Sequence, residues 1–408
     1  MSDKLIKQRI GIVSFEGPHN VIGGVQRRVA EEISYFSRNR SFEIAIIYSG
    51  CGDPFQLDGV SYYPITLPQM IYPLKTILFS FRAARLIQSL PPFDILETHH
   101  DAGFAAMLAG KKTYKRWVEV VHGIFLDEFL TMKKYYSFLS RDFLKASALL
   151  PLSIIEKTAV RKSDAVITVS GFAKMRLAEL YKIPPTKVNI IPNGIRDEIC
   201  KSEKLEPGKP KNSEVVQSKI KFLYAGRLDA RKGILDLIQA FALTVDEIPE
   251  VELTIIGSGS QSAKATLLCD ELGIKEKVNF RGNISDDELV AAYRSADVLC
   301  MPSLQEGQGI VALEAQACGL PVIGTHSGGL PEAVNNGETG FLVPPHDIQR
   351  LAEKMIYLVK NPQIRDQMSK RALVWAGNFF WKNQLKMQQS LFNDLLGDMN
   401  AEYKCALA

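Results

Sequence analysis

The sequence predicts an α/β protein with two doubly wound domains, each built on a parallel sheet. Three observations support this fold class. Short apolar runs alternate with amphipathic segments along most of the chain, which is typical of βαβ units. The alternation stops over the polar residues 196–218, which contain Pro207-Gly208-Lys209-Pro210, and then resumes. The 408 residues also exceed what one core usually supports, so two domains are expected.

The first half begins with a strand at residues 10–15, which reads Ile-Gly-Ile-Val-Ser-Phe. A turn at Gly23 and Gly24 follows, and it opens an amphipathic helix. Because later apolar runs have the same length and are bounded by polar residues, we expect further strands there. These strands lie at residues 42–48, 94–98, 117–121, 165–170 and 187–192.

The same alternation returns after residue 218. Strands are expected at residues 220–225, 251–257, 278–281, 297–301 and 321–324. Helices are expected at residues 233–243, 262–272, 286–294 and 310–317. A helical tail at residues 375–396 carries Trp381 and Phe392 among its apolar positions. In such sheets, ligands bind at the carboxyl ends of the strands, in a cleft between the two halves.

Composition narrows the class of protein. A net charge of +4 is small for this length, so nucleic-acid binding is not expected. The longest nearly apolar stretch, residues 146–155, is too short to span a membrane, and the N-terminus runs directly into a strand without a signal peptide. The six cysteines contain no Cys-x-x-Cys pair and are expected to be buried reduced thiols. We therefore expect a cytoplasmic protein.

The segment from residue 302 to residue 341 carries the strongest signal. Glu306 lies on the loop Glu306-Gly307-Gln308-Gly309, and Glu314 lies inside the helix expected to begin at Ile310. Amides of a Gly-rich loop and a helix N-terminus bind anions, and carboxylates accept hydrogen bonds from sugar hydroxyls. Helix-dipole stabilisation alone explains Glu306, but not a second carboxylate among apolar neighbours. The segment therefore indicates a phosphorylated sugar as the ligand.

Two basic residues follow the strand at residues 220–225. Arg227 and Lys232 lie in the loop before the next helix, and such a pair suits a diphosphate. Two basic residues alone are more often part of a solvated loop, so the diphosphate interpretation depends on the Glu306 segment. Gly257-Ser258-Gly259 ends another strand, but the full Gly-x-Gly-x-x-Gly pattern is missing, which weakens a nicotinamide-cofactor interpretation.

The first half offers a smaller set of polar groups. His122 follows the strand at residues 117–121, and Gly23 with Gly24 would permit close backbone approach to an anion. A single histidine in such a fold is as often structural. His99-His100-Asp101 follows the strand at residues 94–98, and without a third ligand group at useful spacing we interpret it as a cleft-edge loop. No Asp-x-Asp occurs, so a metal-based sugar-nucleotide site is not expected.

A basic segment interleaved with aromatic residues also stands in the first half. Lys133, Lys134, Arg141 and Lys145 lie among tyrosine, phenylalanine and leucine residues. An amphipathic helix in contact with anionic lipid has this pattern, and so does an ordinary helix packed on its domain. A peripheral contact with the inner face of a membrane is therefore one of two interpretations.

The motifs of the second half resemble the donor-site signature of the retaining glycosyltransferases of family 4. The resemblance extends over most of the chain, and further motifs follow the family's order. They are Gly23-Gly24, His122-Gly123, residues 165–170, Ile191-Pro192-Asn193-Gly194, Gly226-Arg227, Lys232-Gly233 and Gly328-Gly329 to Glu332. Gln308 departs from the pattern, since an aromatic residue is common there, and this leaves the donor's sugar open.

The resemblance implies a GT-B fold, with two Rossmann-like domains facing each other across a cleft. It implies that Arg227 and Lys232 hold the donor diphosphate, that Glu306 binds sugar hydroxyls and that Glu314 binds the ribose. The other residues expected to contact the donor are His122, which orients the sugar, and Gly23, Gly24, Gly257, Gln308, Gly309 and Ile310. No metal and no cofactor beyond the nucleotide sugar is expected.

The resemblance also assigns the domains. Residues 1–195 form the acceptor domain, 196–218 a linker, 219–375 the donor domain, and 376–408 a helical tail that crosses back to the first domain. The implied reaction is a metal-independent, retaining transfer of a sugar from a UDP- or GDP-sugar to an acceptor hydroxyl in glycan, glycolipid or cell-envelope biosynthesis. The acceptor could be lipid-linked, a polysaccharide or a small molecule. A nucleotide-sugar hydrolase or epimerase and a non-catalytic binding module are the alternatives.

Overall fold

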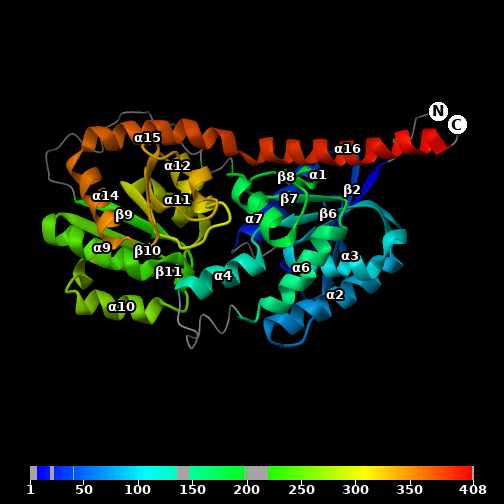
Figure 1. Ribbon diagram of the computed structural model, residues 1–408, viewed down its shortest axis with the longest axis horizontal. Helices are drawn as coiled ribbons and strands as arrows, with labels where there is room; N and C mark the ends of the chain where they lie inside the picture. The colour runs from blue at the N-terminus through cyan, green and yellow to red at the C-terminus, as the bar shows by residue number, and fades with distance from the viewer. Residues whose placement is uncertain are drawn as a thin grey trace. The chain divides into compact units, whose positions relative to one another are not determined.

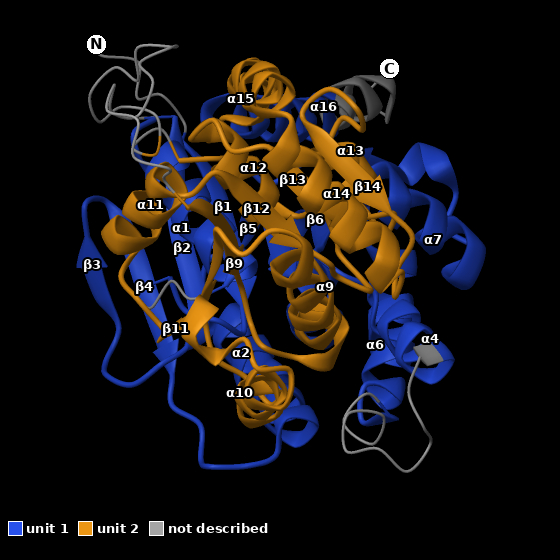
Figure 2. Cartoon of the chain, turned by 90° about the vertical axis from the view of Figure 1, so that its left-hand side faces the viewer, with its two compact units in different colours: residues 1–193, 382–408 blue, residues 194–381 orange. Residues whose placement is uncertain are grey.

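The computed structural model describes residues 7–18, 23–39, 41–135, 147–196, 199 and 219–406, with side chains described to residue 397. The chain divides into two compact units. The first comprises residues 1–193 with 382–408, and the second comprises residues 194–381 (Figures 1 and 2). Each unit is a mostly parallel sheet with helices on both faces, so the prediction of two doubly wound domains is confirmed.

The sheet of the first unit has eight strands. They are β1 (Gln8–Ser14), β2 (Phe42–Ser49), β3 (Phe55–Leu57), β4 (Val60–Ile65), β5 (Phe93–His99), β6 (Tyr114–Val121), β7 (Ala165–Thr168) and β8 (Val188–Ile190). Their order in the sheet is β3-β4-β2-β1-β5-β6-β7-β8, and only the edge pair of β3 and β4 is antiparallel among these strands.

Helices cover both faces of this sheet because successive strand residues point to opposite sides. Ile10 and Ile12 pack in one cluster with α1 and α16, whereas Val13 packs in another with α2 and α3. The long helix α16 therefore belongs to the first unit although it ends the chain (Figure 1). The helices are α1 (Gly24–Ser37), α2 (Tyr72–Ser89), α3 (Gly103–Ala109), α4 (Phe125–Tyr135), α6 (Leu150–Lys162), α7 (Gly171–Tyr181) and α16 (Trp381–Ala406).

The sheet of the second unit has six parallel strands. They are β9 (Ile220–Ala225), β10 (Val251–Ile256), β11 (Val278–Gly282), β12 (Val298–Met301), β13 (Val322–Thr325) and β14 (Gly340–Val343), in the order β11-β10-β9-β12-β13-β14. One core contains residues of α9, α10 and α14, and the other contains residues of α11 and α12. The helices are α9 (Ile234–Glu247), α10 (Ser262–Glu271), α11 (Asp286–Ser295), α12 (Ile310–Ala317), α13 (Leu330–Ala333), α14 (Ile348–Lys360) and α15 (Pro362–Ala376).

Each sheet has a point where the strand order reverses. In the first unit the chain passes from β1 to β2 on one side and returns to β5 on the other side of β1. In the second unit it passes from β9 to β10 and returns to β12 on the other side of β9. The loops after such strands diverge and leave room at the carboxyl edge, where α/β proteins bind ligands. Ligands are therefore expected at the loops after β1 and β5 in the first unit and after β9 and β12 in the second unit.

The sequence interpretation missed short elements. No strand was expected at β3, β4 or β14. β3 has three exposed residues, and β4 contains Pro64 and polar residues that interrupt an apolar run. Residues 197, 198 and 200–218, most of the expected linker, lie outside the described residues, as do residues 136–146 of the basic segment. Cys269, Cys300 and Cys318 are buried as expected, but Cys51 is exposed. Within the described part of the chain, no helix has the length and apolar character needed to span a membrane.

We predict that α16 contributes to the stability of the first unit through Phe392. This side chain is fully buried and stacks on Phe36, with ring centroids 5.5 Å apart. Phe392→Ala should therefore lower the unfolding free energy of the first unit by about 3–5 kcal/mol. Met387→Ala on the same helix removes a half-exposed side chain and should cost about 0.5 kcal/mol or less. Native-state hydrogen exchange in β1 and β5 measures both; equal losses would contradict the expected packing.

Candidate functional site

A buried ion pair joins the two loops at the reversal point of the second unit. Lys232 ends the short 3₁₀ helix η4 (Ala230–Lys232) after β9, and Glu306 lies in the loop after β12. The Lys232 ammonium donates a hydrogen bond to the Glu306 carboxylate, and Ser303 Oγ donates a second one at 2.8 Å. The structure thus brings together two of the predicted site residues, which are 74 positions apart in the sequence.

Among the described residues of the loops around this pair, cations outnumber carboxylates. Burial raises the pKa of Glu306, but Lys232 and Arg231 outweigh it and hold the pKa below its ordinary value. The pKa of Lys232 is lowered by burial, and Arg231 and Arg227 add to this effect against the attraction of Glu306. Three cations thus face two carboxylates, Glu306 and Asp229, the latter 3.4 Å from the Arg227 guanidinium. A bound anion would offset the excess charge.

Two glycines let backbone segments come into contact here, one between the loops after β9 and β12 and one between the loops after β12 and β13. Gly233 has a φ of +69°, and a Cβ there would overlap the carbonyl oxygen of Pro302. Gly328 has a φ of +57°, and a Cβ there would overlap the carbonyl oxygen of Glu306, which also accepts a hydrogen bond from the Gly329 amide at 2.8 Å. Both positions require glycine because a side chain would be strained and would clash. The loops therefore hold Lys232 and Glu306 in place.

The N-terminus of α12 lies directly beyond this loop. Gly309 is the N-cap residue with a φ of +93°, Ile310 is the first helical residue, and Gln308 is buried. Such a helix start presents amide groups and partial positive charge to an anion. Glu314 lies inside the helix, is almost fully buried and accepts a hydrogen bond from the Tyr293 hydroxyl at 3.1 Å. Its expected role as a ribose ligand stays a prediction, since the structure supplies a protein partner.

Arg227 and Gly257 follow neighbouring strands, β9 and β10, at the same edge. The Arg227 side chain is 64% exposed, so it is held far less firmly than Lys232. Its backbone is fixed, because the Tyr224 hydroxyl donates to the Arg227 carbonyl at 2.8 Å. The Gly257 amide donates to the carbonyl oxygen of Gly282 at 2.7 Å. Diphosphate binding by Arg227 and donor binding by Gly257 stay predictions.

Sequence reasoning did not assign a role to three residues that contact the predicted site residues. Ser303 was noted only as part of a motif, and Arg231 and Tyr293 were not noted. Arg231 could have been identified because it lies beside Lys232 in the same loop. Tyr293 could not, because its contact with Glu314 depends on how α11 and α12 pack on the sheet.

In the first unit, the predicted residues lie at the carboxyl ends of β1 and β6. Gly23 caps α1, and its amide donates to the Gln26 side chain at 2.8 Å. Gly24 is the first residue of α1, and His122 follows β6 directly. His122 Nε2 lies 3.1 Å from His99 Nδ1. Ligand contacts by Gly23, Gly24 and His122 stay predictions.

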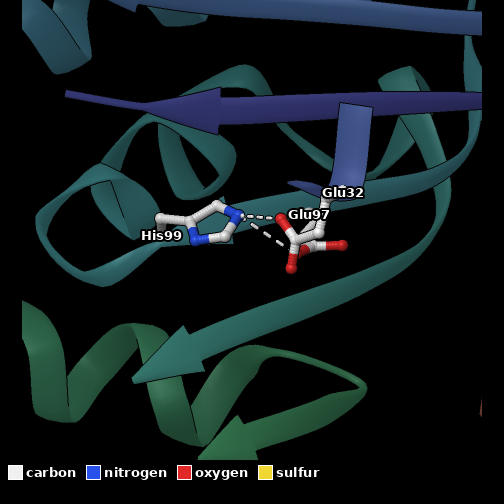
Figure 3. Close-up of side chains that lie close together, drawn as sticks. All are labelled: Glu32, Glu97 and His99. Carbon is white, nitrogen blue, oxygen red and sulfur yellow. Dashed lines mark ion pairs between the residues drawn. The ribbon is translucent and has the colours of Figure 1, made fainter. Parts of the chain in front are cut away.

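The interpretation of His99 as part of a cleft-edge loop was wrong. His99 ends β5 and is fully buried, with Nε2 lying 3.1 Å from Glu32 Oε2 and 3.0 Å from Glu97 Oε1 (Figure 3). Glu32 comes from α1 and also accepts a hydrogen bond from Arg28 Nε at 2.7 Å. A glutamate inside the buried strand at Glu97 was the available sequence signal, because a buried carboxylate needs a partner.

Glu32, Glu97 and His99 could also hold a metal ion by distance alone. Among the described residues, this is the set whose ligand atoms all lie within 4.8 Å of one another. The electrostatics of the set favour a proton on His99. Burial opposes it, but the two carboxylates raise the pKa of His99 to about 9. Burial likewise opposes ionisation of Glu32, yet His99 and Arg28 lower its pKa to about 2, and burial with the charge of Glu32 raises the pKa of Glu97 to about 7.

Two family models match the chain. The model described as Glycosyltransferase Family 4 matches residues 22–199. The model described as Glycosyl transferases group 1 matches residues 207–375. Together the two matches take in most of the chain.

Curated proteins named D-inositol 3-phosphate glycosyltransferase are similar in sequence. The protein of Corynebacterium jeikeium is 32% identical over 257 residues, which are 59% of this chain and 60% of that protein. The protein of Corynebacterium glutamicum is 31% identical over 263 residues, 61% of this chain and 62% of that protein. The chain thus spans about three fifths of the length of these relatives.

Solved structures share the fold over almost the whole chain. Sucrose-phosphate synthase from Thermosynechococcus elongatus aligns with a TM-score of 0.80 at 22% identity, covering 96% of this chain and all of that chain. HepE of Anabaena, in complex with UDP-glucose, aligns with a TM-score of 0.69 at 18% identity, covering 97% of this chain and 99% of that chain. At these identities, the likeness establishes the fold.

We predict that Gly233→Ala destabilises the second unit more than a matched glycine change. Gly273 has a φ of +67°, close to that of Gly233, but a Cβ there would meet open space. Gly273→Ala should cost about 1–2 kcal/mol of unfolding free energy, the cost of the left-handed conformation alone. Gly233→Ala should cost about 1–3 kcal/mol more, because Pro302 must also move. Denaturant unfolding compares the variants, and equal costs would show that the loops do not touch there.

Proposed function

Because the chain belongs to glycosyltransferase family 4 and has the GT-B fold, we propose that it transfers a sugar from a nucleoside-diphosphate sugar to an acceptor hydroxyl with retention of configuration. The donor would be a UDP- or GDP-sugar, bound by the second unit. The acceptor would be bound by the first unit. The observation that carries the proposal is the excess positive charge around Lys232 and Glu306, at the reversal point of the second sheet.

The charge of the leaving group explains why cations are needed there. In the proposed step, the bond between the anomeric carbon and the diphosphate oxygen breaks, and its electron pair goes to the diphosphate. Lys232, Arg227 and the amides at the start of α12 would stabilise that charge. Preorganised donors of this kind contribute about 3–4 kcal/mol each. These protein groups provide charge stabilisation without a divalent cation, so we propose a metal-independent reaction.

Retention places the acceptor on the face that the diphosphate leaves. The acceptor oxygen forms the new bond to the anomeric carbon, and its proton passes to the departing phosphate oxygen. No protein base is needed in this scheme. Glu306 would accept hydrogen bonds from sugar hydroxyls while Lys232 keeps it ionised. His122 would orient the sugar.

The relatives suggest which substrates to test first. One neighbour was solved with UDP-glucose, which makes UDP-glucose the first donor to examine. The relatives named for D-inositol 3-phosphate make a phosphorylated cyclitol the first small acceptor to examine. Lipid-linked and polysaccharide acceptors form the second group. Peripheral contact with a membrane stays a prediction, because residues 136–146 of the basic segment lie outside the described residues.

We predict that Lys232→Ala loses transfer but remains folded. The change removes a charge that would face the leaving diphosphate, so kcat/KM for the donor should fall about 10²- to 10³-fold. Lys264→Ala, on the exposed face of α10 in the same unit, should leave the rate unchanged. Release of nucleoside diphosphate measures the rate, and circular dichroism controls for folding. Unchanged turnover in a folded Lys232→Ala variant would remove Lys232 from the site.

We also predict that the product keeps the anomeric configuration of the donor. The departing phosphate would take the acceptor proton on the face where the new bond forms, and this geometry gives retention. Proton NMR of the product, recorded before anomers equilibrate, reports the configuration through the anomeric coupling constant. An inverted product would contradict the scheme and would require a protein base. Free sugar released equally fast without any acceptor would instead indicate a hydrolase.

A further inference from the structure

A buried cluster of charged side chains contacts His122 through His99. We define the His99 cluster as Arg28, Glu32, Glu97, His99 and Gln388, all fully buried in the first unit. These residues come from α1, β5 and α16, so three elements distant in sequence meet at the carboxyl end of β5. Neither the family resemblance nor the proposed reaction assigns a role to the cluster.

Hydrogen bonds and ion pairs link the members of the cluster. Arg28 donates through Nε to Glu32 at 2.7 Å and through a terminal nitrogen to Gln388 Oε1 at 2.7 Å. The Gln388 amide nitrogen donates to Glu97 Oε2 at 2.9 Å. Both carboxylates approach His99 Nε2 with their other oxygens. Hydrogen bonds from Arg28 and Gln388 thereby hold the two carboxylates next to one ring nitrogen of His99 (Figure 3).

Charge balance favours a proton on His99 over a metal ion. Above the pKa of Glu97, which is about 7, both glutamates are ionised, and Arg28 with a doubly protonated His99 makes the cluster neutral. A divalent cation bound to a neutral His99 would leave one uncompensated positive charge in a fully buried place, which is costly. Glu119, the next carboxylate on β6, accepts a hydrogen bond from Thr98, and burial raises its pKa well above the ordinary value. Glu119 is therefore neutral near pH 7 and does not change the net charge of the cluster.

A doubly protonated His99 determines the state of His122. Carboxylates only accept hydrogen bonds, so His99 Nε2 carries a proton, and the charged ring also carries one on Nδ1. That Nδ1–H points at His122 Nε2 at 3.1 Å, so Nε2 must accept. His122 then keeps its own proton on Nδ1. Among the residues that the structure describes, none hydrogen-bonds to His122 Nδ1, so this nitrogen is available as a donor.

We propose that the His99 cluster is a positioning device that holds His122 as the neutral tautomer with its proton on Nδ1, which makes His122 a hydrogen-bond donor to the sugar and removes it as a base. The assignment of the sugar as its ligand rests on the proposed function. Glu32, Glu97 and His99 are positioning residues, because they act through His122. Burial and the charges of His99, Arg28 and His100 lower the pKa of His122 well below its ordinary value, in agreement with a neutral ring.

The tautomer of His122 is the direct test. The full chain, labelled with nitrogen-15 in its six histidines, is examined by long-range proton–nitrogen NMR, with His122→Asn and His99→Asn assigning the signals. We expect His99 to be protonated on both nitrogens and His122 on Nδ1 alone, from about pH 6 to about pH 8. A His122 ring protonated on Nε2, or titrating within this range, would overturn the proposal. So would a stoichiometric metal ion in the purified protein that Glu97→Gln removes.

Variants separate positioning from folding. Glu32→Gln and Glu97→Gln each remove a charge that stabilises the His99 imidazolium, so the His122 signals should shift towards an ordinary titrating histidine. Glu156→Gln is the control: Glu156 is equally buried, burial raises its pKa to about 8, and it has no hydrogen bond or ion pair with His99 or His122 among the described residues. It should leave both rings unchanged. Equal His122 signals in all three folded variants would overturn the proposal.

Activity distinguishes this proposal from the proposed function. In an active enzyme, Glu97→Gln should lower kcat about 10- to 100-fold with little change in the donor KM, as expected when a partner that orients a functional histidine is lost. Glu156→Gln should not. If His122 carries its proton on Nδ1 but the protein transfers no sugar, the proposed function is contradicted and the proposal of a positioning device is retained. Active transfer with the opposite tautomer would contradict the positioning device alone.

Discussion

The ion pair between Lys232 and Glu306 is the interaction on which the candidate site depends. Both side chains are largely buried, so neither charge would be tolerated without the other. Gly233 lets the loops after β9 and β12 come into backbone contact, Gly328 brings the loop after β13 against Glu306, and Ser303 supplies a further donor to Glu306. The pair is therefore fixed before any ligand arrives. Among the described residues, its surroundings carry more positive than negative charge, which suits an anion. Burial is the main cause of the lowered pKa of Lys232, whereas Lys232 and Arg231 lower the pKa of Glu306 against the effect of its burial.

Buried charges are also paired with one another in the first unit. At the reversal point between β1 and β5, the buried charges of Arg28, Glu32, Glu97 and His99 compensate one another. His99 links these charges to His122, because its Nδ1 lies 3.1 Å from His122 Nε2. Helix α16 completes this cluster with Gln388, so a segment at the end of the chain stabilises groups near its beginning. Each sheet thus holds buried ion pairs near its carboxyl edge, and those of the second unit are accompanied by further cations.

Strand periodicity and loop composition predicted which residues lie at the carboxyl edge of the second sheet. Arg227, Lys232 and Glu306 could be placed at one sheet edge because each follows a strand of the same parallel sheet, and the Gly-rich loop before Ile310 marked the start of α12. Side-chain partners could not be predicted in the same way. The bond from Tyr293 to Glu314 depends on helix packing. The His99 cluster likewise depends on how α1, β5 and α16 pack together, which no local spacing predicts. The sequence pattern also did not predict that the Arg227 side chain is 64% exposed.

The central claim is that the second unit binds the diphosphate of its ligand through the charges around Lys232. Calorimetric titration of the full chain with uridine, UMP and UDP, and with the matching guanosine series, tests it most directly. Hydrogen bonds to charged groups contribute about 1.5–3 kcal/mol, so the diphosphate of the accepted series should bind at least about tenfold more tightly than the monophosphate. Equal affinities for nucleoside and nucleoside diphosphate in both series would contradict the account.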